Sequence, residues 1–491
     1  MGVGVSDWKL ARAVSGYGQL GVVSGTGIAT VLARRLGCGD VDGHMRRAAA
    51  AFPQADVAKR VLDRYLVAGA GPSEGGYKST PMPMVPFNQA LTELTVLAAF
   101  IEVYLAKEGH NGLVGLNLLE KVQPPTLPTL FGAMLAGVDY VLMGAGIPRF
   151  IPGALDAMAQ WQAFDLRLDV EGLPPGQMVT HRFDPSQFAS PSASVGTTEL
   201  PALRRPAFLA IVSSATLALT LARKSNGRVD GFVVEGSIAG GHNAPPRGAM
   251  ALTDEGEPIY GLRDDPDFKK IAEIGLPFYL AGGFGTPAKL AAARRLGAAG
   301  VQVGTAFAFC QESGITPEIK ARVMAMVRSG TVRVFTDPRA SPTGFPFKVV
   351  SMDESISNES QYANRLRRCD LGYLRRIYQR SDGTLGYRCA AEPVDDYVAK
   401  GGLLEETQGR KCLCNALFAT IGLAQCDADG LAEAAIVTAG NDVAQLHRYL
   451  PPGADVYRAA DVLNYMFGNS PPLEVEPCHT AGVSEESAGV L

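Results

Sequence analysis

Residues 276–310 read LPFYLAGGFGTPAKLAAARRLGAAGVQVGTAFAFC, which is a strand, a glycine turn, a helix, a second strand and a second glycine turn. The first apolar run, Pro277 to Ala281, leads into three glycines, and Thr286 stands where it can cap a helix that begins at Pro287. Glycines let the backbone approach an anion closely, and a helix start offers unpaired N–H groups. The stretch therefore predicts a phosphate cradle.

A second turn belongs to the same cradle. The strand Gly300 to Val303 ends in Gly304 and Thr305, whose amides can meet the same anion from the neighbouring strand. Two adjacent parallel strands with glycine at both carboxyl ends match the phosphate site of a (β/α)8 barrel. The predicted cradle residues are Gly282, Gly283, Gly285, Gly304 and Thr305.

Buried apolar runs elsewhere in the chain alternate with helical segments. The runs lie at 19–24, 113–118, 140–143, 208–212, 231–235, 278–281 and 301–303. Such alternation favours parallel strands joined by crossover helices, so the fold class is predicted to be an α/β (β/α)8 TIM barrel. Only seven strands are counted. Either Val3 to Val5 takes the place of the eighth strand, or the chain as given lacks a short amino-terminal strand.

The pattern also predicts a division of the chain. A barrel domain is expected over residues 1–337, with a helical, proline-interrupted insertion at about 38–112 that shapes the pocket mouth. The sequence RLDVEGLPPGQMVTHRF, residues 167–183, is expected to form a surface hairpin. Residues 338–491 show no further strand–helix units and are expected to form a mixed, mainly helical cap domain.

Composition narrows the class of protein. The chain has 491 residues, 47% of them hydrophobic, and a net charge of −4, which argues against nucleic-acid and membrane-surface binding. We find neither an apolar run long enough to span a bilayer nor a charged-then-apolar leader, so a cytoplasmic location is expected.

A histidine follows another predicted strand. In VVEGSIAGGHNAPPRG, Gly240 and Gly241 precede His242 soon after the strand 231–235 ends. The carboxyl ends of barrel strands form the face on which barrel enzymes carry out catalysis. We favour a catalytic role over the alternative of a loop histidine bonded to backbone. Arg247 follows as a cation that either binds an acidic ligand or is solvated.

Three stretches carry a family resemblance. VEGSIAGGHNAPPRG, AGGFGTPAKLAAARRLGAAGVQVGTAF and the amino-terminal MGVGVS with LARAVSGYGQLGVVSG resemble the nitronate monooxygenase (2-nitropropane dioxygenase) family. The same elements occur in flavin-dependent enoyl-acyl-carrier-protein reductases and in trans-acting enoyl reductases of polyunsaturated fatty acid synthases. The resemblance covers most of residues 1–350.

The resemblance implies a barrel that binds FMN non-covalently, with the phosphate on the cradle. His242 is expected to face the N5 edge of the flavin. The other implied cofactor contacts are Met1, Gly2 and Gly4 against the flavin ring, Asn117 as a hydrogen-bond partner, Ser213, Glu235 and Gly236 on the ribityl side, and Gly240 and Gly241 beside the histidine.

The resemblance also implies a reaction. In the first hypothesis, His242 and FMN oxidise an alkyl nitronate with O2, the imidazole acting as base or hydrogen-bond donor. The alternative is an NAD(P)H-dependent enoyl-thioester reductase, and a third hypothesis is a flavin-binding scaffold. The expected partner is a small-molecule substrate, with an acyl carrier protein and a second copy of the chain as candidates.

Cysteines and arginines cluster outside the predicted barrel. Four cysteines have the spacing C-x19-C-x22-C-x-C and either hold zinc or an iron–sulfur cluster or are reduced thiols, so the predicted site contains no metal. They are Cys369, Cys389, Cys412 and Cys414. The neighbouring arginines form either a solvated helix face or a dock for an acidic carrier protein. They are Arg365, Arg367, Arg368, Arg375, Arg376 and Arg380.

Overall fold

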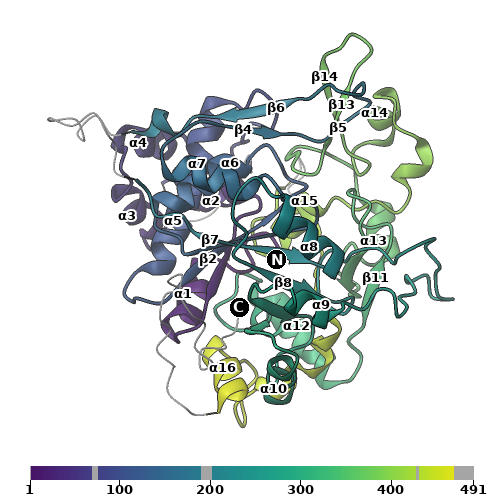
Figure 1. The fold of residues 1–491 in the computed structure, drawn as a ribbon. Coiled ribbons are helices and arrows are strands. Elements are labelled where there is room, and N and C mark those ends of the chain that lie inside the picture. The colour runs from purple at the N-terminus through teal and green to yellow at the C-terminus, as the bar shows by residue number, and fades with distance from the viewer. Residues whose placement is uncertain (1, 69–75, 190–201, 427–430, 469–491) are drawn as a thin grey trace.

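A sheet of seven parallel strands forms the centre of the computed structural model, which describes residues 2–68, 76–189, 202–426 and 431–468 (Figure 1). Neighbouring strands follow the order β1-β2-β3-β7-β8-β9-β10, so each new strand joins the same growing edge. Their bounds are β1 (Gly21–Ser24), β2 (Val114–Leu119), β3 (Tyr140–Gly144), β7 (Ala207–Val212), β8 (Gly231–Glu235), β9 (Phe278–Ala281) and β10 (Gly300–Gln302). The predicted α/β barrel class is confirmed, with seven strands in the described sheet.

The amino-terminal segment lies beside the first strand. The N–H of Ser24 donates to the Ser6 carbonyl at 2.8 Å, and the Ser24 hydroxyl donates to the Gly2 carbonyl at 2.8 Å. On its other side, the Gly314 N–H donates to the Val5 carbonyl at 2.8 Å, shortly after β10. Residues 2–6 therefore contact β1 and the segment that follows α11 without forming a strand.

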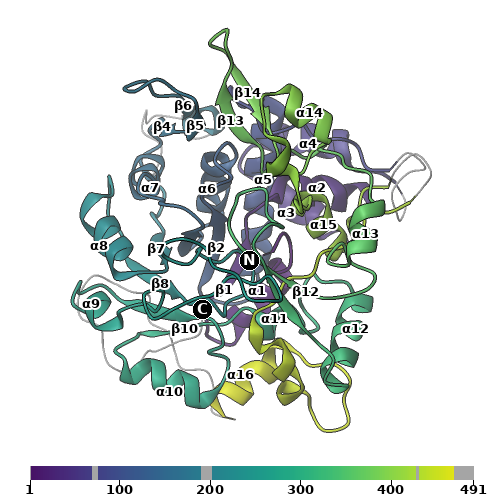
Figure 2. The same cartoon turned by 90° about the vertical axis from the view of Figure 1, so that its right-hand side faces the viewer.

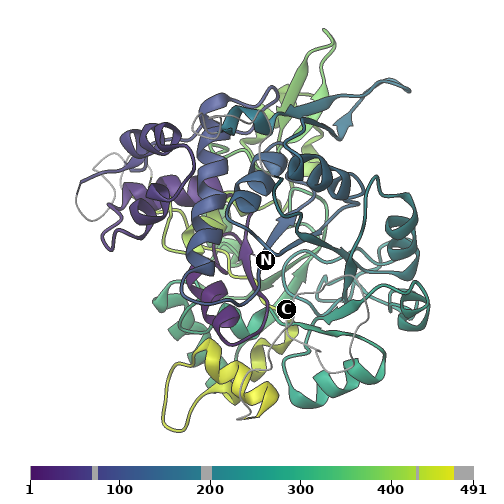
Figure 3. The same ribbon diagram turned by 60° about the vertical axis from the view of Figure 1, so that its left-hand side comes forward.

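Helices cover the outside of the sheet. Local signals explain several of them, since Asp7 caps α1, Ser214 caps α8 and Thr286 caps α10 through side-chain oxygens. Helices α3, α4 and α5 gather on one side of the molecule (Figure 3). The helix bounds are α1 (Trp8–Gly16), α2 (Ile28–Gly37), α3 (His44–Ala50), α4 (Ala55–Tyr65), α5 (Gln89–Lys107), α6 (Thr126–Leu135), α7 (Ile151–Ala159), α8 (Ala215–Lys224), α9 (Phe268–Ala272), α10 (Pro287–Arg295), α11 (Thr305–Ala308) and α12 (Pro317–Arg328).

Helix α5 corrects one expectation from the sequence. It is long and apolar enough to cross a membrane by length and composition, although 78% of its most apolar window is buried inside the protein. Its Glu102 carboxylate accepts the Trp8 N–H at 2.9 Å and pairs with Arg35. It packs against α1, α2 and α6, as a core helix does.

Short strands and helices follow the barrel. The hairpin of β11 (Val334–Asp337) and β12 (Phe347–Val350) crosses the predicted boundary at 337/338. The hairpin of β13 (Arg376–Gln379) and β14 (Leu385–Arg388) takes β5 (Val170–Glu171) as a parallel neighbour and projects at one end of the molecule (Figure 2). The remaining helices are α13 (Glu359–Asn364), α14 (Val394–Ala399), α15 (Leu413–Thr420), α16 (Ala459–Phe467) and the 3-10 helices Pro185–Phe188, Leu404–Thr407 and Asn441–Tyr449.

The predicted surface hairpin is confirmed. Strands β4 (Phe164–Arg167) and β6 (Thr180–Phe183) pair antiparallel, and the N–H of Gln177 closes the turn by donating to the Pro174 carbonyl at 3.1 Å.

Helix α16 packs on α1, α10 and α11. Helix α16 therefore contacts helices that neighbour both the first and the last strand of the sheet.

Candidate functional site

One large cavity opens at the carboxyl ends of the barrel strands. It has a volume of about 250 Å³ and a mainly apolar wall. Many of the residues predicted for the site line it. They are Gly2, Asn117, Glu235, Gly240, Gly241, His242, Gly282, Gly283, Gly304 and Thr305.

Four other predicted residues, Gly4, Ser213, Gly236 and Gly285, do not line this cavity. Met1 lies outside the described residues. Within the described part of the chain, no residue of the 38–112 segment lines the cavity. That segment instead packs its long helix α5 into the core.

The glycine turns of the predicted cradle face the cavity. Gly282 and Gly283 have φ angles of +96° and +71°, a conformation that disfavours any side chain with a Cβ. The Thr286 hydroxyl accepts the Lys289 N–H at 3.2 Å, which starts α10 as predicted. A Cβ at Gly304 would meet no atom within 4 Å, so the second turn is open. The backbone at both turns fits a phosphate.

A C-terminal segment reaches the cradle. The Gly440 N–H donates to the Thr305 hydroxyl at 2.9 Å, and the Tyr449 hydroxyl donates to the Gly285 carbonyl at 2.6 Å. Asp442 lines the cavity near Thr305, and burial raises the pKa of its carboxyl. An acidic group therefore stands beside the predicted phosphate position.

His242 lies among groups from the C-terminal part of the chain. Its Nε2 is 2.7 Å from the Ser341 hydroxyl, which is 2.8 Å from the Thr343 hydroxyl. The Phe347 ring packs edge-on against the imidazole, with ring centroids 4.8 Å apart. Burial lowers the pKa of His242 to about 3, so the imidazole is neutral at pH 7.

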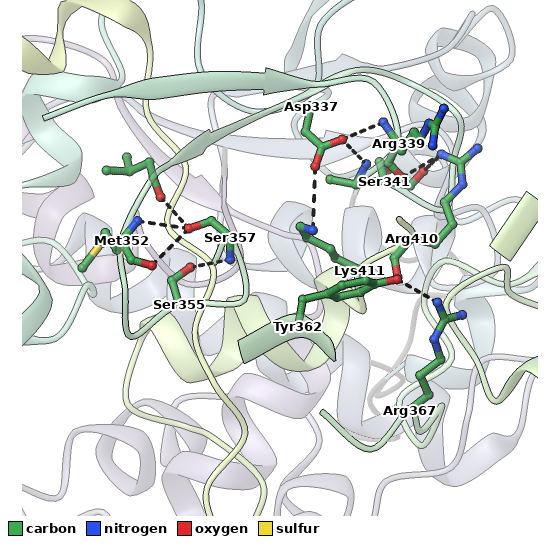
Figure 4. Close-up of polar contacts among 12 residues, drawn as sticks. Asp337, Arg339, Ser341, Met352, Ser355, Ser357, Tyr362, Arg367, Arg410 and Lys411 are labelled. Carbon is green, nitrogen blue, oxygen red and sulfur yellow. Dashed lines mark hydrogen bonds and ion pairs between the residues drawn. The ribbon is translucent and has the colours of Figure 1, made fainter. Parts of the chain in front are cut away.

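Ser341 is held in a braced loop (Figure 4). The Arg410 guanidinium donates to the Ser341 carbonyl at 2.6 Å, and the Lys411 N–H donates to the Ala340 carbonyl at 2.8 Å. The Asp337 carboxylate accepts the Ala340 N–H at 2.9 Å. These contacts hold Ser341, the hydrogen-bond partner of the imidazole, in a fully buried position.

Two more charged residues have different placements. Glu235 ends β8 and lines the cavity, where burial raises the pKa of its carboxyl to about 7. Arg247 is exposed and outside the cavity wall, and its backbone N–H donates to Asp264 at 2.7 Å. The structure thus brings Glu235 to His242's cavity but leaves Arg247 at the surface.

The arginine cluster is bonded largely within the fold. Arg365 forms a buried ion pair with Glu433, and Arg376 pairs with Glu171 at 3.0 Å. The Arg375 guanidinium donates to the Pro83 carbonyl at 3.0 Å. These three arginines are therefore bonded to other parts of the protein, and Arg365 is buried with its partner.

Sequence reasoning missed the residues that surround the histidine and the cradle. Ser341, Phe347, Thr438, Asp442 and Tyr449 all come from beyond residue 337. No local motif marks them, because their partners lie far away in the sequence.

Comparisons with known proteins agree with the cradle and histidine region. Residues 197–336 match the family model for nitronate monooxygenase, which confirms the predicted resemblance over this stretch. A probable nitronate monooxygenase of Bacillus subtilis is 36% identical over 115 residues, covering 23% of this chain and 31% of that protein. A (3aS,4S,5R,7aS)-5-hydroxy-7a-methyl-1-oxo-octahydro-1H-indene-4-carboxyl-CoA dehydrogenase of Mycobacterium tuberculosis is 30% identical over 155 residues, covering 30% and 38%.

The chain spans less than half the length of these curated relatives. Among solved structures, FabK from Thermotoga maritima has a TM-score of 0.42 and 15% identity, covering 94% of this chain and 88% of that one. The enoyl reductase domain of MlnA from Bacillus amyloliquefaciens has a TM-score of 0.39 and 10% identity, covering 76% and 83%.

Proposed function

We propose that this chain, whose residues 197–336 match the nitronate monooxygenase family model, is an FMN-dependent oxidoreductase that oxidises alkyl nitronates with O2. One observation carries the proposal: His242 and the glycine turns after β9 and β10 line the same cavity. When bound, the flavin accepts the substrate's electrons and passes them to O2. The chain's own residues bind the cofactor, orient the substrate and exclude water.

The cradle holds the FMN phosphate in this proposal. Backbone N–H groups at Gly283 and Gly304 meet the anion, and the helix start at Thr305 adds its dipole. Asn117 and Glu235 offer polar groups to the rest of the cofactor from the ends of β2 and β8. Gly285, Gly4, Ser213, Gly236 and Met1 keep only the role that the family resemblance implies.

His242 acts on the substrate as a neutral imidazole. Its low pKa makes it a poor acceptor of a full proton in the closed site, so the hydrogen-bond role is favoured over the base role. With Nε2 against Ser341, the other ring nitrogen is the atom available to a nitronate oxygen. Ser341 acts on substrate only through the imidazole and is a positioning residue.

Anaerobic stopped-flow measurement tests this proposal. The flavin-loaded protein is mixed separately with propionate 3-nitronate, NADH, NADPH and a crotonyl thioester, and flavin absorbance is followed. Rapid bleaching by the nitronate alone is the expected result, with FMN as the flavin released by heat. A colourless protein that ignores added FMN would overturn the proposal.

One comparison favours a second candidate, an NAD(P)H-dependent enoyl-thioester reductase. The Mycobacterium tuberculosis relative is named for an acyl-CoA substrate, and the cavity wall here is mainly apolar. Bleaching by NADH or NADPH, followed by reoxidation with crotonyl thioester, would select this candidate. An acyl carrier protein would then be a partner, and the free thioester would react more slowly than the carrier-bound one.

Three further expectations belong to the proposal. We infer a cytoplasmic location, which the burial of α5 supports. We keep the division into a barrel over 1–337 and a cap domain over 338–491, and a homodimer as the assembly to test by light scattering. None of these rests on the contacts of the cavity.

A further inference from the structure

Four cysteines surround a second, small cavity next to the main one. Its volume is about 10 Å³, and Cys369, Cys389, Cys412 and Cys414 all line it. The other lining side chains are apolar except for Arg368. A buried water needs about two to four polar partners, which thiols supply poorly because they are weak donors and acceptors. The cavity therefore suits a soft metal ion better than solvent.

The four thiols come from three separate segments. Cys369 precedes β13 and Cys389 follows β14 directly. Cys412 occupies the N-cap position of α15, and Cys414 lies in the first turn of that helix. All four are free, and they pack into one cluster with Ala391. An ion bound by these four sulfur atoms would join the β13–β14 hairpin to α15. The part of the chain around them has little regular structure.

Backbone amides point at the sulfur atoms. The N–H of Ala391 hydrogen-bonds the Cys389 sulfur, and the N–H of Asn415 hydrogen-bonds the Cys412 sulfur. Two further backbone amides donate to Cys414. Donors of this kind stabilise negative charge on sulfur and are the outer partners that metal-bound thiolates need.

Cations also lie near the cluster. Arg365 and Arg375 interact electrostatically with Cys412 and Cys369, and Arg368 lines the cavity itself. Four thiolates around a divalent ion carry a net charge of −2. Arg365 is paired with Glu433, and Asp370 and Glu392 also lie near Cys369, so Arg368 and Arg375 are the cations that offset part of this charge.

The side chains must rotate to close a site. As they lie, no group of three or more His, Cys, Asp and Glu side chains in the described residues is arranged to hold an ion. The Cys369 and Cys389 thiols instead hydrogen-bond each other, the arrangement of protonated sulfur. A change of χ1 rotamer moves a cysteine sulfur by about 3 Å, which is enough to turn it toward the cavity between them.

We propose that Cys369, Cys389, Cys412 and Cys414 bind one zinc ion as four thiolates in a closed, tetrahedral, structural site. Such sites have Zn–S distances of about 2.3 Å and no open position. The cavity has the volume of a single water or ion, so a mononuclear site fits it better than a larger cluster. Binding releases four protons to solvent and involves no redox change.

Metal analysis of the full-length chain tests the site. The chain is purified anaerobically with a reducing agent, and its metals are measured by inductively coupled plasma mass spectrometry. We expect one zinc per chain in the natural protein, and a loss of at least about 90% in Cys369→Ala and Cys412→Ala. Cys310→Ala is the matched control, because Cys310 is a buried free thiol that lines neither cavity.

Two measurements on the natural protein test the site even where a variant fails to fold. Titration with a mercurial reagent should release the zinc as about four thiols react, and cobalt(II) reconstitution should produce the intense visible bands of a tetrahedral thiolate site. Iron with acid-labile sulfide, absence of metal with no cobalt spectrum, or unchanged zinc in both variants would each overturn the proposal. These readouts are independent of turnover, so they fail or succeed separately from the proposed activity.

Discussion

The barrel end and the C-terminal segments build the same cavity in different ways. The barrel end contributes backbone at glycine turns, each made by a strand, a turn and a helix that are adjacent in sequence. The C-terminal segments contribute side chains across long separations, such as 99 positions between His242 and Ser341 and 197 between Gly241 and Thr438. The barrel end thus offers a binding platform, and the C-terminal segments set the environment of its histidine.

The difference shows in the pKa of His242. The imidazole stands at the end of a barrel loop, yet Phe347 and Ser341 enclose it from the other region. Burial lowers its pKa to about 3. The chemistry of a barrel residue therefore depends on segments that the barrel pattern does not include.

The largest expected effect removes the imidazole from the platform. His242→Ala should lower turnover by about 10²-fold or more, because the group that contacts substrate is lost, while flavin binding stays unchanged. Steady-state kinetics and flavin titration measure the two properties. His447→Ala, at an exposed histidine, is the control. Unchanged turnover in His242→Ala would remove the imidazole from the reaction.

A smaller effect, on stability, is expected from a substitution that forces the two regions apart. A Cβ at Gly240 would lie 2.8 Å from backbone atoms of Ala439 and Gly440, whereas a Cβ at Gly236 would meet nothing within 4 Å. We expect Gly240→Ala to lower the free energy of unfolding by about 1–3 kcal/mol and Gly236→Ala by under about 0.5 kcal/mol. Urea unfolding of the flavin-free variants compares them, and equal losses would contradict the close contact.

Loss of the hydroxyl that holds the imidazole should have a moderate effect. Ser341→Ala removes a hydrogen bond of about 0.5–1.5 kcal/mol, so kcat should fall by about 3- to 10-fold with KM unchanged. The pH at which turnover declines should also shift, which a purely structural role would not cause. Ser355→Ala removes another buried hydroxyl of this region and serves as the control. A change confined to KM would sink the positioning role.

The smallest effect concerns the acidic neighbour of the cradle. Asp442→Asn removes a negative charge beside the phosphate position, so FMN should bind about 2- to 5-fold more tightly while riboflavin binding stays constant. Burial raises the pKa of Asp442, so falling pH protonates the natural carboxyl and should narrow the difference. Fluorescence titration measures both ligands, and equal gains for both would disprove the charge effect.

The barrel could be predicted because its signals are local. The cap at Thr286, the helix start at Pro287 and the strand at 278–281 all occur within ten residues of one another and match the structure. Strand ends differ by one or two residues, as at β1, which begins at Gly21 rather than Gln19. End residues lack ladder partners on one side, so composition alone does not define them.

The C-terminal residues that enclose the site could not be predicted, because their contacts are not local. Ser341 and Asp442 show no pattern near them, and their roles arise only from folding against His242 and Thr305. The acidic partners of the arginine cluster could not be predicted either, because Glu171 and Glu433 are far from it in sequence. Pairing between residues far apart in the sequence produces no periodic pattern of hydrophobic and polar residues.

Helix α15 is a wall shared by two cavities, since Leu413 and Cys414 line both the large one and the small one. Any coupling free energy between occupants on the two sides of this wall is equal in both directions by linkage. A ligand in the large cavity that raises the affinity of the small cavity for its ion would slow extraction of that ion by a chelator. The ion must then raise the affinity of the large cavity for its ligand by the same factor. A single dissociation constant, measured with and without the other occupant, therefore reports on both.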